Sequence, residues 1–335
     1  MISLRDIARE SGFGISTVSM VLSNRTSKCH IKEDTKEKIL LTARNMGYIR
    51  NEIAAQIRSG KTKTLIVFLP ERIGGYLSEV MLHTMEVGAQ WGYFLKPYFF
   101  HESDDFAKII ENALSQYPAA FFSIDDIGFR FQTLREYSSR TGIPWFSLDF
   151  PAECADLQIV FDEEIGIREA VERLVVLGHK KVTHFTTDLK AGFARRRLEL
   201  YRREVIEHGL DWKEELVFHE ILSQEVLEVY VKHLLSHPDR PTAITCGSDY
   251  LALSLMMALF ASGIRIPDEI SLIGFGGLKI GRTCFPHLDS IRQPWHELLE
   301  TAIRSLIDLL DKKQIQSEIL LPTSYQRAGT TSTAR

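Results

Sequence analysis

Cysteine is scarce in this chain of 335 residues. Its four cysteines lie far apart, at positions 29, 154, 246 and 284, and no two form a C-x-x-C pair. A disulfide framework and a zinc ribbon therefore have no support. The amino-terminal segment carries charge where a secretory signal needs an apolar core, and no apolar run approaches the ~20 residues that cross a bilayer. We expect a cytoplasmic protein that does not contact a membrane.

Motifs for catalysis and nucleotide binding are also missing. The GFGG stretch at 274–277 fits neither G-x-x-x-x-G-K nor G-x-G-x-x-G, and no H-E-x-x-H or hydrolase elbow occurs. His179 and His184 flank a predicted strand, where a structural role is the simpler interpretation. We predict that the chain is not an enzyme and needs neither a metal nor a cofactor.

Positive charge is concentrated at one end of the chain. Residues 1–63 hold twelve Lys and Arg and six Asp and Glu, a net charge of +6. Since the whole chain carries −4, the remaining residues carry −10. A basic head on an acidic body is the distribution that binding of phosphate groups by one end requires. A charge-rich helical head without such a function would have the same composition.

The basic head has the periodicity of three short helices. An apolar face begins at Leu4, and Ser3 with Asp6 is close to a capping box for that first helix. Two glycines then turn the chain, and a second helix over 16–22 and a third over 34–46 follow. Two short helices across a glycine-containing turn are typical of a helix-turn-helix. The alternative is a three-helix bundle of another kind.

Two stretches of this head resemble the LacI/GalR family, which contains the lac and purine repressors. They are LRDIARESGFGISTVSMVLSN and DTKEKILLTARNMGYIRNEIAAQIRSGKTKT. The matching elements, in order, are D-[IV]-A-[RK], T-V-S-x-V-[LI], G-Y and N-x-I-A-x-x-[IL]-R-S-G-[RK]-T. The resemblance implies a transcriptional repressor whose second helix enters the major groove of double-stranded operator DNA.

The same resemblance assigns the DNA contacts. The residues that it places on DNA are Ile15, Ser16, Thr17, Ser19, Met20, Asn24, Ile57 and Arg58. Ile15 and Met20 cannot hydrogen-bond to a base edge but can pack on a thymine methyl group, whereas Ser16 can donate or accept. Many members have Arg or His where this chain has Met20. The short polar side chains suit phosphate oxygens, although ordinary helix-surface polarity explains them equally well.

The hinge helix and linker, at 50–63, have helical composition but too little apolar surface to be stable alone. The resemblance implies that the hinge folds on operator DNA. By the resemblance, Ile57 wedges between base pairs in the minor groove, beside Arg58. Packing of Ile57 against its symmetry mate is the alternative. Arg50 and Ala55 replace a proline and a basic residue that are common in the family.

Beyond the hinge, strand-like and helical runs alternate. The predicted strands are 64–70, 94–99, 119–124, 145–148, 182–186, 215–219, 243–246 and 271–274. The predicted helices are 76–91, 104–116, 129–141, 163–177, 194–208, 225–236 and 248–262. This alternation predicts an α/β body of two doubly wound parallel sheets, with a ligand between the two lobes at the carboxyl ends of the strands.

The resemblance extends through the body in LGHKKV, ASGIRIPDEISLIGFGG and FPHLDSIRQP. It implies an effector-binding domain that is similar to periplasmic sugar-binding proteins. The expected boundaries are 1–49 for the head, 50–63 for the hinge helix and linker, and 64–329 for the body. Within the body, the N-lobe is expected at about 64–161 and 291–321, and the C-lobe at about 162–290 and 322–329.

The expected effector-binding residues are Tyr76, Phe150, Phe161, Arg197, Asp249 and Gly276. Two carboxylates of sugar-binding members are absent, because Phe161 and Gly276 stand at their positions. Arg197, or its neighbour Arg196, would pair with a carboxylate or phosphate, so the pocket suits a neutral or anionic ligand better than a plain sugar. Phe150 and Phe161 would stack on the ligand, or simply fill the cleft. Loss of effector binding is a further alternative.

A helix-turn-helix recognises only a short half-site, so we expect a homodimer on a near-palindromic operator. The effector is expected to be a sugar, a sugar phosphate or another metabolite, and it acts as an inducer or a corepressor. Two other functions stay open. They are a small-molecule binding protein without DNA activity, and an enzyme with a fused DNA-binding head.

Overall fold

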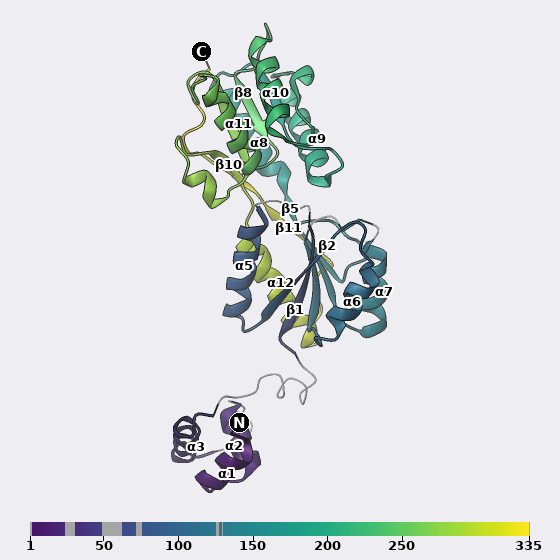
Figure 1. Ribbon diagram of the computed structural model, residues 1–335, viewed down its shortest axis with the longest axis vertical. Coiled ribbons are helices and arrows are strands. Elements are labelled where there is room, and N and C mark those ends of the chain that lie inside the picture. The colour runs from purple at the N-terminus through teal and green to yellow at the C-terminus, as the bar shows by residue number, and fades with distance from the viewer. Residues whose placement is uncertain are drawn as a thin grey trace. The chain divides into compact units, whose positions relative to one another are not determined.

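The structure is a computed structural model that describes residues 2–23, 31–48, 62–71, 76–124, 127–128 and 130–334 (Figure 1). The chain divides into two compact units, Met1–Thr62 and Lys63–Arg335, and each is described by itself. The predicted hinge helix, together with Asn24, Ile57 and Arg58, lies outside the described residues.

Three helices form the first unit, and they confirm the predicted helix-turn-helix head. They are α1 (Leu4–Ser11), α2 (Ile15–Leu22) and α3 (Glu33–Asn45). The capping box is present, since the Asp6 N–H donates to Ser3 Oγ at 3.3 Å and the Ser3 N–H donates to Asp6 Oδ2 at 3.0 Å. Gly12 adopts a φ of +78°, which glycine tolerates and which turns the chain from α1 toward α2.

A small apolar core holds these helices together. Its buried members are Ile7, Ala8, Val18, Val21, Ile39 and Ala43. Val18 and Val21 are three residues apart, so they fix one face of α2 against α1 and α3. The first turn of α2, with Ile15 and Ser16, is left exposed.

The N-lobe of the second unit is built on a parallel sheet with the strand order β11-β5-β4-β3-β1-β2. Its strands are β1 (Thr64–Pro70), β2 (Phe94–Phe100), β3 (Ala120–Ile124), β4 (Trp145–Leu148), β5 (Leu157–Asp162) and β11 (Glu318–Pro322). Its helices are α5 (Tyr76–Gln90), α6 (Phe106–Leu114), α7 (Arg130–Thr141) and α12 (Trp295–Leu310).

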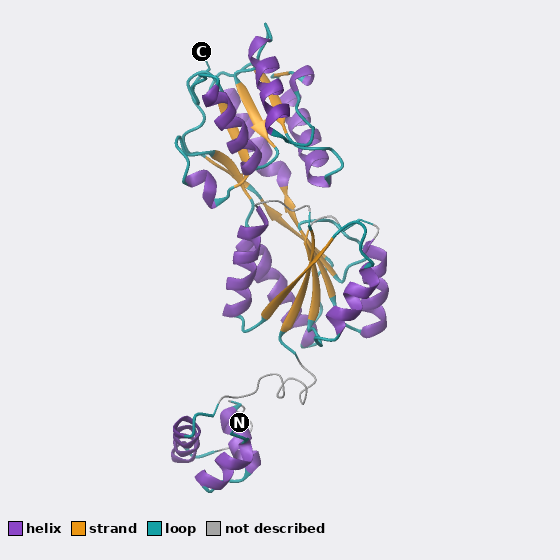
Figure 2. Cartoon of the chain, viewed as in Figure 1, coloured by secondary structure: helices purple, strands orange, loops and turns teal. Residues whose placement is uncertain are grey.

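Both faces of this sheet are covered by helices (Figures 1 and 2). Leu65 and Val67 pack with α5 and α12, whereas Ile66 and Phe68 pack on the opposite face with α6 and α7. Alternate residues of a strand point to opposite faces, so a strand buried on both sides is apolar throughout. That explains why TLIVFLP could be identified as a strand from its sequence.

The C-lobe repeats the plan with the strand order β12-β10-β9-β8-β6-β7. Its strands are β6 (Lys181–Phe185), β7 (Asp211–Trp212), β8 (Ala243–Cys246), β9 (Ser271–Gly276), β10 (Asp289–Arg292) and β12 (Ser324–Gln326). Its helices are α8 (Glu163–Val176), α9 (Gly192–Glu207), α10 (Gln224–Ser236) and α11 (Asp249–Ala261). Helices α8 and α9 cover one face, and α10 and α11 cover the other. Only the β10–β12 pair within this described sheet is antiparallel.

The chain passes between the lobes three times. Helix α8 begins at Glu163 directly after β5, α12 follows β10, and β12 follows β11. The predicted fold class is therefore confirmed.

One predicted strand is wrong. Residues Glu214–Leu216 form a short 3₁₀ helix instead, and the strand beside β6 is β7. Of the expected strand over 215–219, Phe218 alone bridges to Phe185. The apolar run LVF was misleading because Leu216 and Phe218 pack into the C-lobe core, while pairing with β6 is limited to the single bridge at Phe218.

Candidate functional sites

The exposed end of α2 is the candidate DNA-reading surface. No side chain caps this end, where Gly14 precedes the helix. Ile15 is 46% exposed, and Ser16 is exposed as well. The partly exposed residues of the predicted set are Thr17, Ser19 and Met20. The surface offers apolar contact, hydroxyl groups and no acidic residue that would repel a phosphate.

Arg197 lies at the carboxyl ends of the C-lobe strands, the edge where open α/β sheets bind ligands. The side chain comes from α9 and is only 7% exposed. Its Nη1 donates to the carbonyl of Gly247, directly after β8, at 2.7 Å. The Phe275 ring of β9 lies 3.6 Å from the guanidinium carbon, so the cation also rests on an aromatic face.

The charge of Arg197 is balanced by Glu163, the first residue of α8. Nε and Nη2 of Arg197 both donate to Oε1 of Glu163, at 2.9 Å and 2.7 Å, and Nε of Arg196 donates to Oε2 at 2.8 Å. Burial acts to raise the pKa of Glu163, but the two guanidinium groups outweigh it and hold that pKa below its usual range. Both arginines that were expected to receive a ligand anion are thus already paired within the chain.

Asp249, at the start of α11, fastens the loop that follows β9. Its Oδ2 accepts from the Leu278 N–H at 2.7 Å, and its Oδ1 accepts from the Ser290 hydroxyl at 2.5 Å. Burial raises the pKa of Asp249 to about 6, against these two hydrogen bonds. Gly276, with a φ of +128°, adjoins this carboxylate, since a Cβ there would lie 3.5 Å from Asp249 Oδ2. The two residues lie together at one loop.

The predicted aromatic residues have different surroundings. Phe161 is 3% exposed in the N-lobe core and meets the Trp295 ring edge-on at 5.0 Å. Phe150 is half-buried and stacks on Phe131 at 5.8 Å. Tyr76 begins α5, and its side chain lies outside the described residues. Among the aromatic side chains described here, Phe150 is therefore the better placed to meet a ligand.

Two family models match the chain. The one described as bacterial regulatory proteins, lacI family, matches residues 3–51, which contain α1, α2 and α3. The one described as a periplasmic binding protein-like domain matches residues 171–331, so that the two together cover more than half of the chain. The chain belongs to the LacI family.

Relatives of this LacI-family chain match along nearly its whole length. The transcriptional repressor PurR of Mannheimia succiniciproducens is 25% identical over 326 residues, covering 96% of this chain and 95% of PurR. The probable repressor ExuR of Bacillus subtilis is 25% identical over 329 residues, with coverage of 96% and 95%. Catabolite control protein A of Priestia megaterium is 23% identical, with coverage of 95% and 96%. By name these relatives are transcriptional regulators rather than enzymes.

The fold of the family is also that of this chain. The lac repressor dimer bound to operator and the anti-inducer ONPF superposes with a TM-score of 0.80 at 24% identity, covering 99% of both chains. The transcriptional regulator CelR in complex with cellobiose superposes with a TM-score of 0.66 at 19% identity, covering 98% of this chain and 100% of that one.

Two acidic residues near the lobe junction of this LacI-family chain could not be identified from the sequence. Glu163 was hidden in the acidic run Asp162–Glu164, where nothing marks which carboxylate turns inward. Asp149 follows β4 with a φ of +65° and is buried, and Gln293 donates to its Oδ1 at 3.5 Å. A left-handed aspartate at the end of a strand has no signal in the sequence alone.

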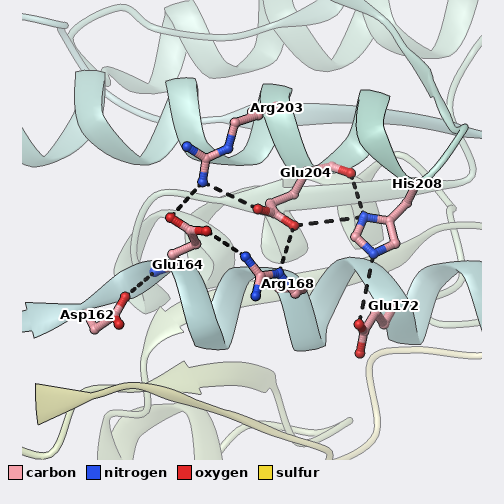
Figure 3. Close-up of polar contacts among 7 residues, drawn as sticks. All are labelled: Asp162, Glu164, Arg168, Glu172, Arg203, Glu204 and His208. Carbon is pink, nitrogen blue, oxygen red and sulfur yellow. Dashed lines mark hydrogen bonds and ion pairs between the residues drawn. The ribbon is translucent and has the colours of Figure 1, made fainter.

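A cluster of ion pairs holds α9 against α8 (Figure 3). The carboxylate of Glu204, on α9, is buried. Its Oε2 lies 3.4 Å from Nε of Arg168 and 3.8 Å from Nδ1 of His208, and its Oε1 lies 3.4 Å from Nη2 of Arg203. Arg168 also pairs with Glu164 at 2.5 Å. Because α9 carries Arg197 and α8 carries Glu163, the cluster fixes the two helices that form the buried pair.

A hydrogen bond also joins the two lobes. Glu79 of α5 accepts from the backbone N–H of Lys279, at the start of the 3₁₀ helix η3 (Lys279–Arg282), at 2.8 Å. Within the described residues, no group of three or more His, Cys, Asp or Glu could hold a metal ion. No helix in the same described part of the chain is long and apolar enough to span a membrane.

Proposed function

We propose that this LacI-family protein is a sequence-specific transcriptional repressor that binds its operator as a homodimer and responds to a small-molecule effector. The observation that carries the proposal is the exposed, uncharged first turn of α2, presented by a three-helix head on a chain with a two-lobed body. DNA is the partner that such a head suits, and the proposal therefore includes a cytoplasmic protein.

On the operator, α2 lies in the major groove with Ile15, Ser16 and Met20 toward base edges. Thymine methyl groups suit the two apolar side chains, so we expect A·T pairs in each half-site. The residues toward phosphates are Thr17, Ser19 and Asn24. Ile57 and Arg58 of the hinge take the minor groove at the centre of the operator, where the two copies meet.

An apolar surface on the N-lobe is our proposed dimer interface. Leu82 and Met85 of α5 are exposed, and so is Phe99 of the neighbouring strand β2, which points to the same face of the sheet as Leu95, the face that α5 covers. Strand β2 lies at an edge of its sheet. Covering this edge in a dimer prevents it from pairing with strands of other proteins. A two-fold contact there would bring two heads to one near-palindromic site.

The effector is proposed to bind between the lobes, at the carboxyl ends of both sheets. The residues proposed to meet it are Tyr76, Phe150, Phe161, Arg197, Asp249 and Gly276. An effector controls the repressor only if it binds the DNA-competent and the incompetent arrangement with different affinity. Operator titrations with and without effector give the sign of that difference.

Operator binding by the Ile15→Ala variant tests the proposal. We expect the variant to bind an operator, obtained by selection from a random DNA pool, about tenfold more weakly, because a base contact is lost. The salt dependence of binding should not change, because the phosphate contacts are kept. Leu41→Ala is the matched control, since Leu41 is exposed on α3 rather than α2. Fluorescence anisotropy measures both affinities, and equal affinities would remove α2 from the interface.

A further inference from the structure

Most hydrogen-bond donors of the Arg197 guanidinium are already used within the chain, so few remain for a ligand anion. A guanidinium group has five N–H donors, and its Nε–Nη2 edge is the one that normally grips a carboxylate or phosphate with two parallel hydrogen bonds. Here both donors of that edge go to Oε1 of Glu163, and Nη1 goes to the Gly247 carbonyl. A single N–H therefore remains on each terminal nitrogen.

Among the described residues, none adds further positive charge on the buried side of the guanidinium. The Glu163 side chain is 1% exposed, so it pairs with Arg197 in a site shielded from water. Arg196, which holds the other carboxylate oxygen, is partly exposed to solvent. On the sheet side lie the uncharged Phe275 ring and the carboxyl group of Asp249. An anion at Arg197 would face the Glu163 carboxylate across a buried cation that is already neutralised.

We propose that the effector is uncharged at the end that meets Arg197, so that ligands with a carboxylate or phosphate at that end are rejected. A hydroxyl or carbonyl oxygen of a neutral ligand accepts hydrogen bonds from the two remaining N–H groups, while Glu163 supplies the counter-charge that an anionic ligand would otherwise bring. The residue types of the pocket are compatible with neutral and with anionic ligands, and the Glu163–Arg197 pair favours the neutral ones. This inference rests on the effector binding proposed above.

Inorganic phosphate is the probe, compared with chloride at equal ionic strength by thermal unfolding of the full chain. We expect no phosphate-specific rise in the Tm of the wild type. In the Glu163→Gln variant Arg197 loses its counter-charge, and we expect phosphate at tenfold its Kd to raise the Tm by about 2 °C or more. The double variant Glu163→Gln/Arg197→Gln should lose this rise, because both charges are removed together.

Glu164→Gln is the matched control, since it removes the adjacent carboxylate, which is partly exposed and pairs with Arg168 and Arg203 instead. It should behave like the wild type. A phosphate-specific rise in the wild type that is absent from the double variant would overturn the inference, whether or not the single variant folds. A folded Glu163→Gln variant without the rise would overturn it too. The test uses no effector and no DNA, so its failure leaves operator binding untouched.

Discussion

At the scale of single residues, burial decides what the candidate pocket residues do. Phe161 and Phe150 look alike in sequence, yet Phe161 packs in the N-lobe core against Trp295, and Phe150 stays half-exposed. Arg197 has no evident partner in the sequence, but in the folded chain it forms an ion pair with Glu163. A buried side chain that is already packed or paired contributes to stability first, and to ligand binding only with what remains.

Truncating the two phenylalanines should separate these roles. Phe161→Ala is expected to lower the free energy of unfolding by about 3–5 kcal/mol, because it leaves a cavity in the core. Phe150→Ala is expected to cost clearly less, since its ring is partly in water. Denaturant titrations of both variants measure the difference, and equal costs would contradict the assignment of Phe161 to the core.

Asp249 makes stability depend on pH. Its pKa is raised to about 6 in the folded chain, against about 4 when unfolded, so the folded state holds the proton more tightly. The contribution of Asp249 to the free energy of unfolding is therefore largest below the unfolded pKa. It decreases by about 3 kcal/mol as the pH rises through the folded pKa of about 6. Asp249→Asn keeps a group that can hydrogen-bond to Leu278 and Ser290 but cannot ionise. The difference in unfolding free energy between wild type and variant should therefore change between pH 4 and pH 6.5, and a constant difference would refute the shift.

At the scale of elements, sequence patterns predicted what depends on local periodicity. The buried strand β1, the capped helix α1 and the order of α1, α2 and α3 follow from residue spacing alone. Residue spacing did not predict five elements of the body, because they are short or lie where the chain passes between lobes. They are β5, β10, β11, β12 and α12. The pairing of β5 with β11 joins segments more than a hundred residues apart, and no local pattern records that.

The same limit applies to the candidate sites. The exposed turn of α2 could be predicted, because its position follows from one short helix and a family motif. The Glu163–Arg197 pair could not be predicted, because it depends on how α8 and α9 face each other across the C-lobe. Sequence gives the residue types in a pocket more readily than the pairs they form.

The hinge is the element whose prediction rests on sequence alone. Ile57→Ala should weaken specific operator binding and reduce DNA bending, because a smaller side chain cannot wedge between base pairs. The Tm of the body should not change, since residue 57 precedes Lys63, where the second unit begins. Energy transfer across a doubly labelled operator measures the bend, and an unaltered bend at unaltered affinity would remove the wedge role.

At the scale of the whole molecule, the proposed function requires two copies. The lobes of one chain are tied by the Glu79–Lys279 hydrogen bond and by three chain crossings, so a change at one lobe can be transmitted to the other. Only a dimer converts such a change into a changed distance between two heads on DNA. The proposed interface on α5 and β2 therefore connects effector binding to operator binding.

An acidic substitution in that interface should separate the copies. Met85→Asp is expected to give a monomer in sedimentation analysis and at least a tenfold loss of operator affinity, because one head contacts only a half-site. Ile206→Asp on α9 is a matched control, since Ile206 is exposed to a similar extent on the opposite side of the C-lobe sheet from α11. A Met85→Asp variant that stays dimeric would place the interface elsewhere.

Selection of bound duplexes from a random DNA pool, carried out at two salt concentrations, tests the central claim most directly. The account predicts a near-palindromic consensus with A·T pairs in each half-site and an affinity that falls steeply as salt rises. The selection would be repeated with metabolite pools, because a corepressor is sometimes required for binding. Failure to enrich any sequence under either condition would contradict a DNA-binding repressor and leave a small-molecule binding protein as the better account.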